Sequence, residues 1–308
     1  MKKYKICLLF WVFTANLFGQ MPIDSQQIMQ NLEILSSDAY EGRGTGQVGI
    51  SKSRDFLVNA FDRLGFEMLD STYRYPFGFL DRVFRNKMDG ENIVGLIRGT
   101  QYPNQYLVLT AHYDHLGIFN EQIYNGADDN ASGTCALLAI GAYFVKHPPK
   151  HSILIVAFDA EEKGLVGSDR FVDEPPVPKD AILLNINMDM ISRNAKNELY
   201  ICGTHHYPFL KAPINRLLKA TPINVLFGHD DPNNYQVENW TSASDHGSFH
   251  QAKIPFLYFG VEDHPDYHKH TDDFDKIKPD FYISAVSFIG ATLLSLDEEW
   301  ELLKDSKK

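Results

Sequence analysis

The sequence contains two adjacent glutamates, Glu161 and Glu162, which are candidates for a catalytic or metal-binding role. They lie in the stretch AFDAEEKGLVGS (157–168), at the end of the apolar run SILIVAF. Acidic residues that follow a strand are often part of a solvated loop. Two neighbouring carboxylates can also serve one site in different ways, one as a metal ligand and the other as a carrier of protons. The pair alone does not decide between these interpretations.

Other apolar runs are also followed by histidine or acidic residues. YLVLTA is followed by HYDH, and AILLNIN is followed by MDM. The candidates in chain order are His112, Asp114, Asp128, Asp129, Glu161, Glu162, Asp189, His268 and Asp272. So many carboxylates would repel one another in a low-dielectric cleft unless cations neutralised them. A pair of divalent cations resolves this conflict, and the mixture of imidazole and carboxylate groups suits zinc.

The elements that must position these residues are short, continuous apolar runs, which predict buried strands of a mainly parallel sheet. The runs are NIVGLI, YLVLTA, SILIVAF, AILLNIN and IPFLYF. Stretches with helical spacing separate them, for example 132–146, and a long closing helix is expected over 282–303. Ligands of open α/β sheets bind beyond the carboxyl ends of the strands. The sequence therefore predicts one α/β domain with a polar site at one edge of its sheet.

Five motifs, in order, resemble those of the secreted bacterial zinc aminopeptidases with two co-catalytic metals, a family whose scaffold is related to the glutaminyl cyclases. They are TAHYDHLG, NGADDNASG, AFDAEEKGLVGS, NINMDMI, and SDHGSFHQAKIPFLYF with the later YHKHTDD. The resemblance extends from about Leu35 to Ile277. It implies the phosphorylase/hydrolase-like zinc exopeptidase fold, a three-layer α/β sandwich with a mixed, mostly parallel central sheet and helices on both faces.

The resemblance also implies a ligand set for two zinc ions. His112 and Asp189 would bind one ion, and Glu162 and His268 would bind the other. Asp128 would bridge the two ions. Asp129 is an alternative to Asp128 at this position and stays open.

Further roles concern proton transfer and support of the ligands. Glu161 would be the general base that activates a metal-bridging water for attack on an N-terminal peptide bond. Asp114 would orient His112, and the spacing of His268 and Asp272 fits a similar pair. Asp245 would lie near the substrate.

The remaining histidines carry weaker expectations. His270 lies in KHTDD, where relatives often have a Thr-Pro pair, so it adds an imidazole near the cleft. Whether it binds metal or substrate stays open. Surface or supporting positions are favoured for the group that comprises His115, His246, His250, His264 and His270.

Two other classes of function compete with a peptidase. The first is a glutaminyl-peptide cyclotransferase, which cyclises N-terminal glutamine with one zinc on the same scaffold. The second is a non-catalytic binding module, whose expected mark is loss of ligands or base, and none is lost here. GTGQVG (44–49) matches G-x-G-x-x-G but follows a helical pattern, so dinucleotide binding is not favoured. The sequence contains no G-x-S-x-G, which gives a serine hydrolase no support.

Composition and the first residues bear on location and partners. Residues 1–19 have the basic start and apolar run of a secretory signal peptide, which predicts export to the periplasm or the outside. Loss of this segment changes the formal charge from −11 to −14, which argues against nucleic acid as a partner. The resemblance implies one zinc exopeptidase domain over 20–308 and peptides with a free N-terminus as substrates. Cys135 and Cys202 lie in apolar stretches that favour buried, unpaired cysteines, and a disulfide between them stays open for an exported protein. No later run is expected to insert stably in a membrane.

Overall fold

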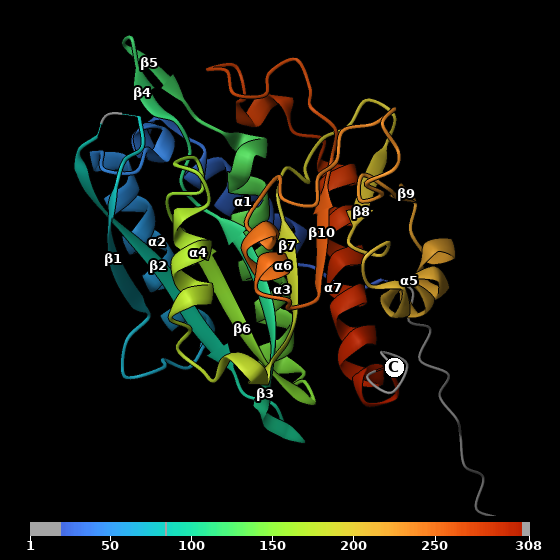
Figure 1. Ribbon diagram of the computed structural model, residues 1–308. Helices are drawn as coiled ribbons and strands as arrows, with labels where there is room; N and C mark the ends of the chain where they lie inside the picture. The colour runs from blue at the N-terminus through green and yellow to red at the C-terminus, as the bar shows by residue number, and fades with distance from the viewer. Residues whose placement is uncertain (1–19, 84, 304–308) are drawn as a thin grey trace, which may run out of the picture.

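The computed structural model describes residues 20–83 and 85–303, and the expected signal peptide lies outside them. Within the described residues, eight strands form one central sheet in the order β1-β2-β6-β3-β7-β10-β8-β9 (Figure 1). Their bounds are β1 Arg74–Leu80, β2 Lys87–Ile97, β3 Tyr102–His112, β6 His151–Phe158, β7 Ile182–Met188, β8 Glu198–Cys202, β9 Asn224–Phe227 and β10 Phe256–Gly260. A separate hairpin pairs β4 (Gly117–Phe119) with β5 (Gln122–Tyr124).

Helices cover both faces of the sheet and complete three layers. One face carries α1 (Ser25–Leu35), α2 (Val48–Leu64), α3 (Gly133–Lys146) and α7 (Pro279–Leu303), and the other carries α4 (Val166–Asp173) and α6 (His246–Gln251). The short α5 (Lys211–Leu217) packs against α7. Short 3₁₀ turns cover Asp38–Arg43, Lys179–Ala181, Pro208–Leu210, Leu218–Ala220 and Phe274–Lys276, and a π-type turn covers Ala127–Ser132.

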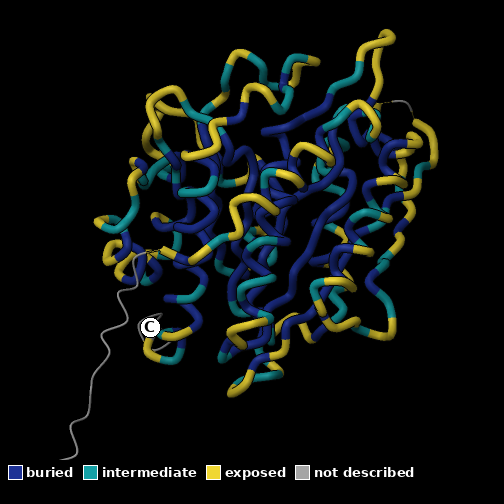
Figure 2. Tube along the Cα trace, turned by 180° about the vertical axis from the view of Figure 1, so that it is seen from behind, coloured by how far each residue is buried: buried dark blue, intermediate teal, exposed yellow. Residues whose placement is uncertain are grey.

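The central strands are buried on both faces because their side chains alternate between two apolar cores. In β3, Leu107 and Leu109 pack beneath the α1, α2, α3 and α7 layer, whereas Val108 packs beneath α4 and α6. β6 alternates in the same way. Figure 2 shows the result as a buried centre with exposed residues mainly in loops and outer helices. This double burial explains why the sequence shows continuous apolar runs.

Four neighbouring strands, β6, β3, β7 and β10, run parallel to one another. Their carboxyl ends therefore meet at the same edge of the sheet. The register pairs His112 at the end of β3 with Phe158 at the end of β6, and Met188 at the end of β7 with Phe259 in β10. The residues that follow these strands are thus brought together by backbone pairing alone.

Most sequence predictions for the elements are confirmed. All five apolar runs lie wholly or largely in strands, and Gly65 ends α2 in the left-handed conformation with φ 81°. The run 92–97 differs, because β2 pairs antiparallel with β6 and so belongs to the mixed part of the sheet. Cys135 and Cys202 are free and buried, as expected.

Helix α7 bears on the expectation that no run after the signal segment inserts stably in a membrane. The segment Pro279–Leu302 is long and apolar enough to cross a membrane by length and composition, and 72% of its most apolar window is buried inside the protein. It packs as a core helix beneath the sheet, where apolar residues on several sides of a helix are needed.

Arg43 connects the first helical layer to the loops at the site edge. Its fully buried guanidinium donates hydrogen bonds to the carbonyl oxygens of Tyr113 (2.9 Å), Leu35 (3.0 Å), Asn125 (2.5 Å) and Gly126 (2.8 Å). Burial lowers the pKa of Arg43 to about 10, although nearby carboxylates oppose that effect. The side chain remains a cation at neutral pH, and it holds the backbone on both sides of the polar site.

Candidate metal centre

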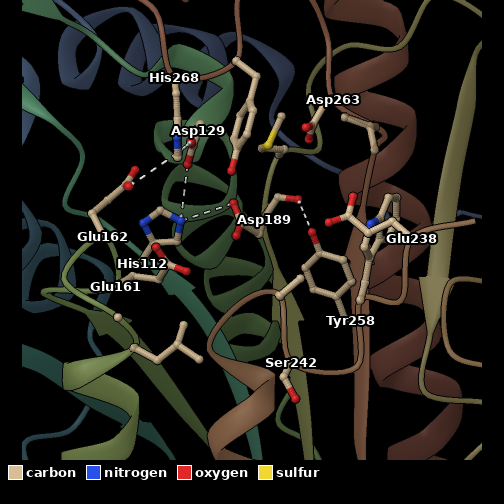
Figure 3. A pocket seen from close by; sticks show the side chains of 17 residues that line it. His112, Asp129, Glu161, Glu162, Asp189, Glu238, Ser242, Tyr258, Asp263 and His268 are labelled. Atoms are coloured by element: carbon tan, nitrogen blue, oxygen red, sulfur yellow. Dashed lines mark hydrogen bonds and ion pairs between the residues drawn. The ribbon is translucent and has the colours of Figure 1, made fainter. Parts of the chain in front are cut away.

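His112, Asp129 and Asp189 form a first group of potential metal ligands. His112 is the last residue of β3, and Asp189 directly follows β7. The Nε2 atom of His112 lies 3.2 Å from Oδ1 of Asp189 and 3.4 Å from Oδ1 of Asp129 (Figure 3). All three residues are buried.

Glu162 and His268 form a second group with the other oxygen of Asp129. The Nε2 atom of His268 lies 3.2 Å from Oδ2 of Asp129 and 3.4 Å from Oε2 of Glu162. Glu162 follows β6, and His268 lies in the segment after β10. Because Asp129 offers a different oxygen to each group, its carboxylate links the two (Figure 3).

The donor atoms fit divalent zinc in type and in spacing. Zinc bonds of about 2.0–2.2 Å to nitrogen or oxygen place neighbouring ligands of a tetrahedral ion about 3.3–3.6 Å apart. The four separations above, 3.2–3.4 Å, are close to that range. They also exceed the usual length of a charge-assisted hydrogen bond, about 2.7–2.9 Å.

The charges of the surroundings favour a cation at both groups. Burial alone would lower the pKa of His112, but Asp189 and Glu161 raise it well above its ordinary value. Burial likewise opposes the charge on His268, yet the carboxylates of Asp129 and Glu162 raise the pKa of His268 to about 10. Positive charge is therefore stabilised where the two zinc ions are expected.

Glu161 lies beside the first group without joining it. Figure 3 shows its carboxylate next to the ring of His112. Burial raises the pKa of Glu161 well above its usual range, the carboxylates of Glu162 and Asp189 raise it further, and His112 opposes the shift. A carboxyl group with a raised pKa is suited to accept and return a proton near neutral pH.

Asp128 differs from the sequence expectation, because its carboxylate points to other partners. Its Oδ1 accepts hydrogen bonds from the backbone nitrogen (2.8 Å) and hydroxyl (2.6 Å) of Ser192, and its Oδ2 lies 3.0 Å from Nε2 of His264. The structure thus places Asp129, the alternative, between the two donor groups and Asp128 in a loop-to-loop contact. Adjacent residues project in different directions, and the sequence does not show which of them faces the site.

Asp114 and Asp272 both support backbone segments through their carboxylates, and Asp114 also contacts the ring of His112 through its carbonyl oxygen. The Nδ1 atom of His112 lies 3.1 Å from the carbonyl oxygen of Asp114 and 3.7 Å from its Oδ1. The Asp114 carboxylate accepts hydrogen bonds from the backbone nitrogens of Glu161 (3.1 Å) and Glu162 (3.3 Å).

The Asp272 carboxylate likewise accepts hydrogen bonds from the loop that contains Asp128 and Asp129. Its Oδ2 accepts hydrogen bonds from the backbone nitrogens of Asp128 (3.0 Å) and Asp129 (3.1 Å). The expected pairing of Asp272 with the ring of His268 is replaced by this backbone contact. The His268 ring instead stacks on Tyr267, with ring centres 3.9 Å apart.

Asp245 and His270 lie outside the cavity wall. Asp245 is buried at the start of α6, where burial raises the pKa of its carboxyl to about 7. The exposed His270 packs edge-to-face against Tyr124 of β5, with ring centres 6.2 Å apart. Neither residue is among those that line the cavity next to the metal groups.

Two residues near the centre were not among the sequence candidates for the site, although a surface or supporting position was favoured for His115. The Nδ1 atom of His115 lies 2.9 Å from Oε1 of Glu162, although a histidine in HYDH carries no spacing signal of its own. Tyr267 lines the cavity, and burial, followed by the charges of Asp129 and Asp189, raises the pKa of its hydroxyl. Its position directly before His268 was the available signal.

A cavity of about 470 Å³ opens over both groups. Glu161, Glu162, Asp189 and His268 line it on the metal side. Its remaining wall includes Met190, Trp240, Tyr258, Val261, Glu238 and Asp263. The volume lies within the usual range for small-molecule sites, about 300–1,000 Å³.

Comparisons with known proteins agree with this geometry. The sequence profile of Peptidase family M28 matches residues 92–292. Aminopeptidase YwaD of Bacillus subtilis (strain 168) is 27% identical over 238 residues, which cover 74% of this chain and 48% of that protein. A glutamate carboxypeptidase 2 homolog of Caenorhabditis briggsae is 35% identical over 111 residues, which cover 34% of this chain and 14% of that protein. The chain thus spans about half, or less, of the length of these curated relatives.

Solved structures share the fold at low sequence identity. A zinc aminopeptidase from Bacillus subtilis has a TM-score of 0.72 at 16% identity, with 89% of this chain and 95% of that chain covered. A glutaminyl cyclase from Fimbriiglobus ruber has a TM-score of 0.71 at 18% identity, with 89% and 96% covered. The architecture is that of the zinc exopeptidases. The profile match extends over more than half of the sequence, and the chain belongs to peptidase family M28.

The two neighbouring aspartates provide a direct test of the bridging position. Asp129→Asn is expected to weaken metal binding at both groups by more than the roughly 10–100-fold that follows loss of an outer partner. Asp128→Asn is the matched control, and it is expected to keep the wild-type metal content while lowering thermal stability. Metal content after dialysis against graded zinc concentrations checks this. Equal loss in both variants would contradict the assignment.

Proposed function

We propose that the chain is an aminopeptidase that removes N-terminal residues from peptides with the help of two divalent cations, most simply zinc. The observation that carries the proposal is the carboxylate of Asp129, whose two oxygens face two separate sets of His, Asp and Glu donors. His112, Asp189 and Asp129 would hold one cation, and Glu162, His268 and Asp129 the other. When bound, such a pair polarises the scissile carbonyl and lowers the pKa of water.

The residues of the chain would then handle the proton and the orientation of the substrate. Glu161, whose pKa is raised by burial, would take a proton from the attacking water and deliver it to the leaving amine. Asp114 keeps Glu161 and Glu162 in fixed relative positions through their backbone nitrogens. The hydroxyl of Tyr267 stays protonated, so it is a hydrogen-bond donor in the cavity.

Cyclisation of N-terminal glutamine is the second candidate, since glutaminyl cyclases share the fold. The two linked donor groups favour hydrolysis, because a one-zinc cyclase does not require a carboxylate shared between two cations. Peptide substrates are also in line with membership of a peptidase family.

A panel of aminoacyl amides and glutaminyl peptides tests the proposal, with Glu161→Gln and Glu162→Gln as paired variants. The wild-type protein is expected to release free amino acids and no pyroglutamate. Glu161→Gln is expected to retain both ions but lose turnover by about 10²–10⁴-fold, the usual contribution of a general base. Glu162→Gln is expected to lose one ion. Pyroglutamate as the main product with one bound zinc would refute the aminopeptidase, and full activity of Glu161→Gln would refute its mechanism.

The far wall of the cavity bears on which N-terminal residue is accepted. Met190 and Val261 give it an apolar surface, and Glu238 and Asp263 add two carboxylates. Burial and the neighbouring Glu238 raise the pKa of Asp263, which indicates that the two carboxylates are close. Among residues 20–83 and 85–303, neither of them forms an ion pair. A substrate side chain with an aliphatic stem and a cationic end would pack its stem on the apolar surface and place its charge near the two carboxylates. We therefore propose a preference for N-terminal lysine or arginine.

Removal of the two charges tests this preference. The double variant Glu238→Gln/Asp263→Asn is expected to reduce kcat/KM for lysyl substrates on the order of ten-fold, because each exposed charge contact contributes up to about 1 kcal/mol. Leucyl substrates are the control and should change less than two-fold. An equal fall for both substrates, or no fall for the lysyl one, would argue against the preference.

Export is proposed from residues 1–19, whose composition is that of a secretory signal peptide. Expression of the full chain in a bacterium with a Sec pathway is expected to give a periplasmic or extracellular product that begins near Gln20. N-terminal sequencing of the purified product checks this. An intact Met1 on a product retained in the cytoplasm would contradict it.

A further inference from the structure

His115 and Glu162 are in direct contact behind the second donor group. The side chain of His115 is fully buried, and its Nδ1 atom lies 2.9 Å from Oε1 of Glu162. The same nitrogen lies 3.7 Å from Oδ2 of Asp129, beyond hydrogen-bond distance. His115 is thus a hydrogen-bond partner of one glutamate oxygen.

The other oxygen of Glu162 has different surroundings. Its Oε2 lies 3.4 Å from Nε2 of His268, which is the spacing of two ligands of one zinc ion rather than of a hydrogen bond. The two oxygens are therefore divided between two imidazoles, Oε1 with His115 and Oε2 with His268.

The tautomer of His115 follows from its neighbours. Both groups that approach Nδ1 are carboxylates, which accept and do not donate hydrogen bonds when ionised. Nδ1 must therefore carry a hydrogen and donate it to Oε1. Its other nitrogen, Nε2, is buried without a hydrogen-bond partner among the described residues, so no second contact turns the ring away from Glu162.

The ring of His115 is also held firmly by its packing. A Cβ atom at Gly126 would lie 2.5 Å from Cδ2 of His115, so the ring occupies space that only glycine leaves free. The carbonyl oxygen of Gly126 accepts a hydrogen bond from Arg43, and the backbone nitrogen of His115 donates to the carbonyl of Arg43 at 3.2 Å. A rigid outer partner fixes the direction of a ligating carboxylate.

We propose that His115 is a positioning residue that fixes Glu162 for one-oxygen binding of the second cation. This inference rests on the two-cation site of the proposed function. It assigns His115 to the support of a ligand and leaves the coordination of the ion to Oε2 of Glu162, His268 and Asp129. Without the contact to Oε1, the Glu162 carboxylate is free to rotate, and the binding of one of the two ions weakens.

Two substitutions at residue 115 separate positioning from direct binding. His115→Asn places an amide nitrogen near the position of Nδ1 and keeps a donor for Oε1, whereas His115→Leu fills space without a donor. His115→Leu is expected to weaken the binding of one ion by about 10–100-fold, as is typical when an outer partner is lost. His115→Asn is expected to recover most of the affinity.

The measurements are zinc affinity by competition with a chelator, metal content by mass spectrometry, and the absorption spectrum of the cobalt(II)-substituted protein. His264→Asn is the matched control, because His264 contacts Asp128 at 3.0 Å and neither residue belongs to a donor group, and its two ion affinities should equal those of the wild type. Circular dichroism and thermal unfolding of the metal-free variants confirm that each one folds.

Wild-type affinity for both ions in His115→Leu would overturn the proposal. Equal loss in His115→Leu and His115→Asn, with a changed cobalt spectrum, would also overturn it and place the imidazole in the coordination sphere. Because metal binding is measured without substrate, a protein that binds both ions but hydrolyses no peptide refutes the proposed function and leaves the role of His115 standing.

Discussion

The concentration of carboxylates at one edge of the sheet is the constraint on which the rest of the site depends. Asp129, Glu161, Glu162 and Asp189 gather where four parallel strands end, and their mutual repulsion in a buried setting demands positive charge. The carboxylates also act on the neighbouring histidines. Burial lowers the pKa of His112 and His268, but the carboxylates raise both pKa values above the ordinary value. The same excess of negative charge suits divalent cations. The distances between the donor atoms, 3.2–3.4 Å, are close to those expected between two ligands of one zinc ion.

The buried carboxylates outside the two donor groups have a structural task. Asp114, Asp128 and Asp272 accept hydrogen bonds from backbone nitrogens or hydroxyls of the loops that carry the ligands. Arg43 complements them by donating to carbonyl oxygens of neighbouring loops. Backbone groups in loops at the end of a sheet lack the hydrogen bonds of strand pairing, so side chains form hydrogen bonds with them instead. The donor side chains of the two groups are thus held in place by a framework of polar contacts.

The adjacent glutamates show how one short segment supplies two different functions. Burial opposes ionisation of Glu162, yet the neighbouring His115 and His268 lower the pKa of its carboxyl below its usual range. Among the described residues, no histidine forms a hydrogen bond with the Glu161 carboxyl, and burial raises its pKa although His112 opposes the shift. These opposite shifts support the proposed roles, in which Glu162 binds a cation as an anion and Glu161 exchanges a proton. The difference arises from neighbours that are distant in the sequence.

The strands and their burial could be predicted from the sequence, because continuous apolar runs are typical of strands that are buried on both faces. The sequence also showed that His112, Glu161, Glu162 and Asp189 lie at strand ends, which a parallel sheet brings together at one edge. It did not separate Asp128 from Asp129, and it did not show that the carboxylates of Asp114 and Asp272 accept hydrogen bonds from backbone nitrogens. Those choices depend on the direction of side chains in irregular loops, which no periodic pattern encodes. The tertiary structure alone placed His115 against Glu162, since that contact requires a loop after β3, a loop after β6 and the open space at Gly126 to meet.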